Sequence, residues 1–133
     1  SSEVAKSQIA NIENCYSQMN ELYDMVGEGS SIMANTNISI DNFGKLLHEA
    51  WKNKRSLSNK VTNTKIGELY NAAIKAGATG GKVLGAGGGG FILFFVKPEN
   101  QDKVKKALSS LTFVPFNFEN TGSKVVLYQP NGI

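Results

Sequence analysis

Five glycines crowd into the six residues from Gly85 to Gly90, within the stretch VLGAGGGGFILFFV. A row of bare backbone N–H groups can approach a phosphate closely and bind it as an anion nest. Glycine is also common in hairpin turns, because it reaches positive φ angles without steric cost. A hairpin needs only one or two glycines, and each further one costs roughly 0.5–1 kcal/mol of backbone entropy relative to alanine. The surplus favours a ligand-facing loop over a simple turn.

The context of the loop excludes two common nucleotide-binding motifs. Gly85, Gly87 and Gly90 match G-x-G-x-x-G, but that pattern is informative only when a strand precedes it and a helix follows. Here the apolar segment FILFFV follows, and it predicts a strand. A Walker A loop would need Lys and then Ser or Thr after its last glycine, whereas Phe91 follows Gly90. The loop therefore belongs to neither class.

A second group of candidate residues lies in the segment HEAWKNKRSLSNK, which concentrates four basic side chains: Lys52, Lys54, Arg55 and Lys60. Arginine suits phosphate recognition through its bidentate fork, and lysine through its point charge. The alternative to phosphate binding is that these residues form a solvated helix face, with positive charges at the helix end where they oppose the helix dipole. We select Arg55, together with Lys54 and with Lys82 just before the glycines, as candidate substrate contacts. His48, the only histidine, is expected to be an ordinary helix residue and not a catalytic base.

Composition limits the classes of partner. The 133 residues carry 14 Lys and Arg against 11 Asp and Glu, a net charge of +3 that is too slight to argue for nucleic acid. Anionic small molecules remain possible. Cys15 is the only cysteine, which excludes an internal disulfide and a thiolate metal cluster and suits the cytoplasm. No apolar run approaches the roughly 18 residues of a membrane helix, so we expect a soluble protein with no membrane partner.

Four segments have the apolar spacing or the flanking residues of helices. The first covers residues 3 to 26 and ends at Gly27 and Gly29, with a predicted inward face of Ile9, Ile12, Tyr16, Met19, Tyr23 and Val26. Ser39 is expected to cap a second helix, which buries Ile40, Phe43, Leu47, Ala50, Lys54 and Leu57. Asn63 or Thr64 caps a third, which ends at Gly77, and Pro98 opens a short fourth.

After Gly77 the spacing becomes extended, and two pairs of strands are expected. GKVLGA pairs with FILFFV across the glycines, and TFVPFNF pairs with SKVVLYQ around ENTG. The predicted fold class is therefore α+β, with helices packed on one face of a mostly antiparallel sheet. FILFFV is apolar at every position, so we expect a missing domain or a partner subunit to cover its second face. The opening SSEVAKSQIANIE has no initiating Met and predicts a fragment of a longer chain.

The segment KVLGAGGGGFILFF resembles the third signature motif of the GHMP kinases, the superfamily of galactokinase, homoserine kinase, mevalonate kinase and phosphomevalonate kinase. The longer stretch from LLHEAWKNKRSLSNK to FFV is similar to the D-glycero-D-manno-heptose 7-phosphate kinase branch. The resemblance covers most of the chain. It implies that residues 1–133 form the C-terminal domain, of ferredoxin-like two-layer build with N-terminal helices added, and that the first strand of that unit lies upstream of Ser1.

The resemblance further implies a kinase that transfers the γ-phosphoryl group of ATP, with Mg²⁺, to a sugar or sugar phosphate. The nucleotide-facing residues carried over are Gly85, Ala86, Gly87, Gly88, Gly89 and Gly90. In such kinases the N-terminal domain holds the P-x-x-x-G-L-G-S-S loop and the catalytic aspartate and lysine, none of which occurs here. The resemblance therefore assigns no catalytic residue to this chain and makes the N-terminal domain its partner. A homo-oligomer stays possible.

Three functions stay open at this point. The first is heptose 7-phosphate phosphorylation. The second is another GHMP activity, on a galactokinase-like or mevalonate kinase-like substrate. The third is a ferredoxin-like regulatory module that senses a small metabolite through the glycine loop. Besides these, a purely structural fragment whose glycine loop is only a turn stays open.

Overall fold

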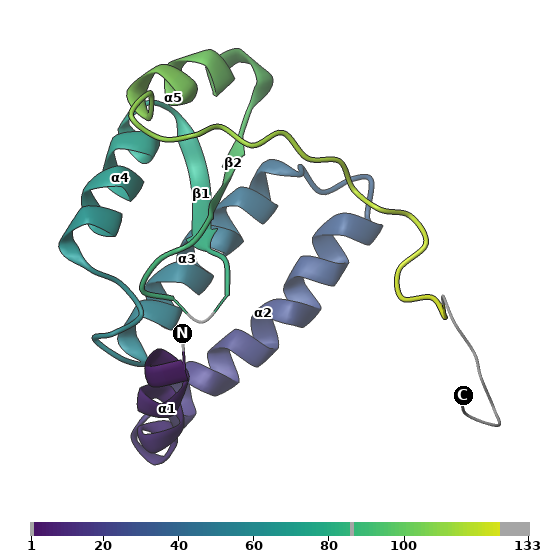
Figure 1. Cartoon of the computed structure of the whole chain (residues 1–133). Coiled ribbons are helices and arrows are strands. Elements are labelled where there is room, and N and C mark those ends of the chain that lie inside the picture. Colours follow the sequence, from purple (N-terminus) through teal and green to yellow (C-terminus); the bar gives the residue numbers. More distant parts are fainter. Residues whose placement is uncertain (1, 86, 126–133) are drawn as a thin grey trace, which may run out of the picture.

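The computed structural model describes residues 2–85 and 87–125 (Figure 1). Its elements in chain order are α1 (Ser2–Ala10), the 3-10 turn η1 (Ile12–Asn14), α2 (Tyr16–Ala34), α3 (Asp41–Ser56), α4 (Thr64–Lys75), β1 (Ala78–Val83), β2 (Ile92–Val96), the 3-10 turn η2 (Pro98–Asn100) and α5 (Gln101–Ala107). The two strands form an antiparallel hairpin. The predicted α+β class is confirmed.

Local capping signals place the ends of α4 where the sequence predicts them. The Asn63 side chain accepts a hydrogen bond of 2.9 Å from the backbone N–H of Ile66, which satisfies a donor in the first turn of α4. Gly77 has a φ of +112° just after the end of α4, a conformation that glycine adopts without a Cβ penalty. The predicted cap of α3 is displaced by one residue: the helix starts at Asp41 after Ile40, which makes no capping bond, although the Ser39 hydroxyl accepts from the N–H of Asp41 at 3.3 Å. These ends are fixed by neighbours within a few residues.

Helix α3 lies on strand β1 at the distance of backbone contact. A Cβ added at Gly80 would overlap the carbonyl oxygen of Gly44, and a Cβ added at Gly44 would lie 2.7 Å from the Phe95 ring. Glycine at these positions removes the side chains that would otherwise separate helix and strand. The contact brings α3 alongside the hairpin and fixes where its last turns lie.

The chain's own helices meet the apolar strand β2. The ring of Phe94 lies 5.7 Å from that of Tyr70 on α4, and the ring of Phe95 lies 6.3 Å from that of Phe43 on α3. Neighbouring residues of a strand point to opposite faces. Phe94 and Phe95 of the apolar run FILFFV therefore contact helices of this chain, whereas Phe91 is exposed and the residues of β2 are only half-buried, so the expected cover by another domain or subunit stays a prediction.

Two clusters of buried side chains form the core. The larger one joins α3, the connector after it, α4 and β1, through Trp51, Val61, Ile66, Tyr70 and Val83. The smaller one joins α4, β1 and α5, through Ala73, Ala78 and Val104. The hairpin is thus held by apolar contacts with three helices.

The prediction of one helix over residues 3 to 26 is wrong in two respects. The chain leaves the α-helical path between Ala10 and Tyr16, and α2 then continues past Gly27 and Gly29 to Ala34. Gly29 is buried, and a Cβ there would lie 3.5 Å from the Leu46 side chain. A Cβ there would make only ordinary van der Waals contact, so Gly29 is an interior residue on the side of α2 that faces α3 and does not end the helix.

The predicted inward face of this segment is also wrong. Ile9, Tyr16, Met19, Tyr23 and Val26 are exposed, and Ile12 is half-buried. The residues of α2 that turn toward α3 are Leu22, Met25, Gly29 and Ile32. Both sets recur at helical spacing, so the pattern alone could not decide which set is buried. Likewise Ile40, expected in the core before α3, is exposed.

The last predicted pair of strands is not found in the described residues. The segment TFVPFNF and residues 123–125 have no strand hydrogen bonds and are exposed, and the rest of SKVVLYQ lies outside the described residues. Pro115 has no N–H to donate to a neighbouring strand. The described sheet therefore consists of β1 and β2 alone. No helix among the described residues is long and apolar enough to cross a membrane.

We predict that Gly80→Ala destabilises the fold strongly, because its Cβ would overlap the Gly44 carbonyl and push α3 away from β1. The free energy of unfolding should fall by at least about 2 kcal/mol, measured by urea denaturation. Gly67→Ala is the matched control, because nothing lies within 4 Å of its Cβ in the interior of α4. That control should raise the free energy of unfolding by about 0.5–1 kcal/mol. Equal effects of the two variants would refute the backbone contact.

Candidate functional site

The glycine loop, residues 85–90, connects β1 to β2. Its base is closed by a hydrogen bond of 2.9 Å from the Leu84 N–H to the Phe91 carbonyl. The hairpin connection expected from the two flanking strands is confirmed. Ala86, one of the predicted nucleotide contacts, lies outside the described residues.

The glycines of this loop have a conformational reason. Gly85, Gly87, Gly88 and Gly90 have φ angles of +84°, +113°, +76° and +105°. Residues with a Cβ rarely adopt such angles. Four of the five glycines are thus required by the path of the backbone, and the sequence argument from their surplus missed this. Gly89 does not have a positive φ, and the space beside it is open.

The loop rests on the connector between α3 and α4. The N–H of Gly88 donates to the Val61 carbonyl at 2.9 Å, and the Asn63 amide donates to the Gly88 carbonyl at 3.4 Å. A Cβ at Gly87 would lie only 2.6 Å from the Val61 carbonyl oxygen. The backbone at Gly87 and Gly88 therefore sits directly on the connector.

The outer part of the loop offers hydrogen-bond donors. Within the described ranges 2–85 and 87–125, the N–H groups of Gly89 and Gly90 donate to no backbone or side-chain oxygen, and both residues are exposed. The N–H of Gly88 is already used by Val61. An anion could thus be met by Gly89 and Gly90, and not by every glycine of the run.

Two lysines lie at the base of the loop. The Lys54 ammonium, near the end of α3, donates to the Gly85 carbonyl at 2.6 Å. Lys54 and Lys82 line the same small cavity of about 50 Å³, together with Leu22, Ala50 and Trp51. Burial first, and then the charge of Lys82, lower the pKa of Lys54. In the part of the chain that the structure describes, no carboxylate pairs with either ammonium. Their repulsion would be relieved by a bound anion.

The remaining candidates are less closely placed. Arg55 is exposed and has no ion pair within the described residues. His48 bonds the Tyr70 hydroxyl through Nδ1 at 2.7 Å, with the two rings stacked, which is a packing role. Lys52 pairs with Glu49 on the surface of α3, and Lys60 lies 4.0 Å from Glu3. No group of three His, Cys, Asp or Glu side chains suited to a metal occurs among the described residues.

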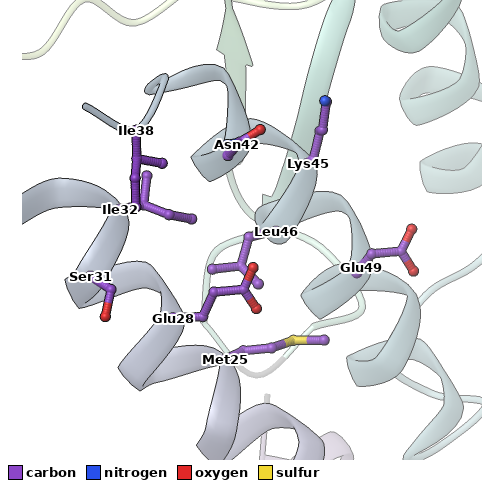
Figure 2. A pocket seen from close by; sticks show the side chains of 9 residues that line it. All are labelled: Met25, Glu28, Ser31, Ile32, Ile38, Asn42, Lys45, Leu46 and Glu49. Atoms are coloured by element: carbon purple, nitrogen blue, oxygen red, sulfur yellow. The ribbon is translucent and has the colours of Figure 1, made fainter. Parts of the chain in front are cut away.

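A hollow larger than the lysine cavity lies away from the loop. It is a groove of about 430 Å³ between α2 and α3, whose lining residues include Met25, Ile32, Leu46, Lys45 and Glu49 (Figure 2). No pattern in the sequence predicts this groove, because it depends on how the two helices cross. It holds none of the predicted site residues, so size alone does not identify the ligand site here.

Comparison with known families decides what the loop belongs to. The family described as "GHMP kinases C terminal" matches residues 32–112, which is more than half of the chain and includes the glycine loop and both lysines. The chain belongs to the GHMP kinase family. The α+β structure with its antiparallel hairpin is consistent with the ferredoxin-like C-terminal domain of that family.

Two characterised kinases are similar to the chain. The D-glycero-alpha-D-manno-heptose 7-phosphate kinase of Campylobacter jejuni is 41% identical over 64 residues, which cover 48% of this chain and 19% of that protein. A galactokinase of Candida parapsilosis is 34% identical over 71 residues, which cover 53% of this chain and 14% of that protein. The match thus spans about a fifth or less of either kinase.

We predict that Gly87→Ala distorts the loop, because it combines a φ of +113° with a contact to the Val61 carbonyl. The free energy of unfolding should fall by about 1–2 kcal/mol, and the Gly88 N–H should lose protection against hydrogen exchange. Gly89→Ala is the matched control and should leave both quantities unchanged, since its Cβ meets nothing within 4 Å. Protection at Gly88 that survives in both variants would contradict the described loop geometry.

Proposed function

We propose that residues 1–133 act as the C-terminal domain of an ATP-dependent sugar kinase. One observation supports this above the others: the family match includes a glycine loop whose outer N–H groups and basal lysines suit a phosphate. The reaction would transfer the γ-phosphoryl group of ATP to a sugar hydroxyl. Such transfers depend on positioning and on stabilisation of charge, with little covalent chemistry for the protein to perform.

In this proposal each part of the site has one task. The N–H groups of Gly89 and Gly90 would donate hydrogen bonds to phosphate oxygens of ATP. Lys54 would hold the Gly85 carbonyl, and Lys82 would add a second positive charge beside it. Arg55, exposed on α3, would contact the substrate. The described loop surroundings offer no carboxylate set for Mg²⁺. The catalytic groups and the metal ligands would therefore come from another domain of the same protein. We expect that protein to act in the cytoplasm.

The acceptor we propose is D-glycero-D-manno-heptose 7-phosphate. The more similar of the two kinases named above acts, by its name, on this class of compound, and the basic residues near the loop suit an acceptor that already carries a phosphate. The galactokinase match supports a second candidate, an unphosphorylated hexose. The two candidate acceptors differ in charge, so an assay with both can show which one the enzyme prefers.

We predict that the full-length protein containing these residues phosphorylates heptose 7-phosphate with ATP, with a higher kcat/KM than for galactose. The measurement is a coupled assay of ADP release over both acceptors. The 133-residue chain alone should give no turnover, because the catalytic groups would lie elsewhere. Faster turnover of galactose would transfer the proposal to the second acceptor, and measurable turnover by the 133 residues would refute the division of tasks.

We predict that Lys54→Ala and Lys82→Ala each lower kcat/KM of the full-length enzyme by about tenfold to a hundredfold, the loss expected for one hydrogen bond to a charged group. Lys52→Ala is the control, because Lys52 pairs with Glu49 on the surface of α3. It should change kcat/KM less than about twofold. A thermal unfolding scan of each variant excludes loss of fold as the cause, and equal kcat/KM in all three variants would count against the lysine site.

A further inference from the structure

The Tyr70 hydroxyl lies buried where α3, α4 and β1 meet. Tyr70 is only 2% exposed, and a buried tyrosine hydroxyl usually has a hydrogen-bond partner. The backbone N–H of Gly81, on β1, donates to its oxygen. The same oxygen lies 2.7 Å from Nδ1 of His48, on α3. One side-chain atom of α4 therefore links a helix to a strand.

The two hydrogen bonds have a definite direction. Burial, the largest influence, raises the pKa of the Tyr70 hydroxyl, which therefore keeps its proton at neutral pH. Its oxygen accepts from Gly81, so its proton is the one donated to Nδ1 of His48. A chain of two hydrogen bonds thus runs from β1 through α4 to α3.

Both ends of this chain lead to the two lysines beside the glycine loop. Lys82 is the next residue after Gly81 on β1. Lys54 follows His48 by six residues, about 9 Å along α3. A shift of α3 along β1 would therefore change the distance between the two ammonium groups.

The other contacts around this point control separation more than position along the strand. Gly44 and Gly80 allow helix and strand to approach closely, and the Trp51 ring lies 6.2 Å from the Tyr70 ring. Van der Waals contacts of this kind have little directional preference. Hydrogen bonds have a narrow range of lengths and a preferred angle. The Tyr70 hydroxyl is thus suited to fix where α3 lies along β1.

We propose that Tyr70 is the positioning residue of the lysine site, and that its hydroxyl holds Lys54 and Lys82 at the same end of the hairpin. Tyr70 acts through the backbone of the two elements that carry the lysines and takes no part in chemistry. The purpose of the site rests on the proposed function. The placement of the lysines is a property of this chain and can be measured without a ligand.

The test is the pKa of the Lys54 ammonium, measured by NMR titration of the 133-residue chain with isotope-labelled lysine. Burial and the charge of Lys82 lower this pKa in the parent chain. Tyr70→Phe keeps the ring and loses both hydrogen bonds. Lys54 should then lie farther from Lys82 and closer to water, so its pKa should rise toward the ordinary value of a lysine.

A second variant and a control separate positioning from stability. His48→Leu removes the acceptor of the Tyr70 proton and should raise the pKa of Lys54 in the same direction. Val104→Ala is the matched control, because it weakens the smaller core cluster, which shares no residue with the lysine cavity. It should leave the pKa of Lys54 unchanged. Circular dichroism confirms that each variant is folded during the titration.

An unchanged pKa of Lys54 in either folded variant, Tyr70→Phe or His48→Leu, overturns the inference. An equal rise in Val104→Ala also overturns it, because lost stability would then explain the effect. A rise in both variants that is absent from Val104→Ala supports it. If that rise occurs while Lys54→Ala and Lys82→Ala keep the parental kcat/KM, Tyr70 positions the lysines but their proposed role in phosphate binding is wrong.

Discussion

The contact on which the rest of the structure depends is that of helix α3 with strand β1 at Gly44 and Gly80. Because neither residue has a side chain, the helix lies against the strand at the distance of backbone atoms. Lys54 follows Gly44 by ten residues, about 15 Å along the helix, and Lys82 follows Gly80 by two. The two ammonium groups therefore reach the same end of the hairpin, where Lys54 bonds the first carbonyl of the loop. A larger residue at either glycine would push α3 away from β1 and so move Lys54 away from the loop and from Lys82.

The loop obtains its shape from the connector between α3 and α4. Four glycines of the loop adopt positive φ angles, which they can do because they have no Cβ. The contacts with Val61 and Asn63 then select this backbone conformation among the many that glycine allows. Glycine-rich segments lose much conformational entropy when they become ordered. At Gly87 and Gly88, which contact the connector, that loss occurs during folding, so this part of the run would not lose it again when a phosphate binds.

The features that the sequence predicts well are those decided within a few residues. Asn63, Gly77 and the hairpin across the glycines are of this kind, since each rests on a cap or a turn. The position of α3 decides which side of α2 is buried. Two sets of apolar residues on α2 have the same helical spacing, so the sequence alone does not show which set faces α3. The predicted end of that helix lies too early in the chain, because a glycine such as Gly27 or Gly29 commonly marks the end of a helix, whereas α2 continues to Ala34. The site likewise combines a local feature with one that depends on the fold. The glycine motif identifies the loop and Lys82 from the sequence, whereas the hydrogen bond from Lys54 to the Gly85 carbonyl exists only in the folded chain.

The connector that carries the loop also carries the N-terminal helix. The hydroxyls of Ser7 and Ser58 are hydrogen-bonded at 2.8 Å, and the Asn11 amide donates to the Leu57 carbonyl at 3.0 Å. A Cβ at Gly88 would lie 3.4 Å from the Val4 side chain, so α1 borders the loop itself. The Glu3 to Lys60 pair is exposed and adds little. Helix α1 and the glycine loop are therefore supported by one short segment, residues 57–63, and a displacement of that segment would move both. The loop's geometry consequently depends on residues some eighty positions earlier in the chain, which no local motif could reveal.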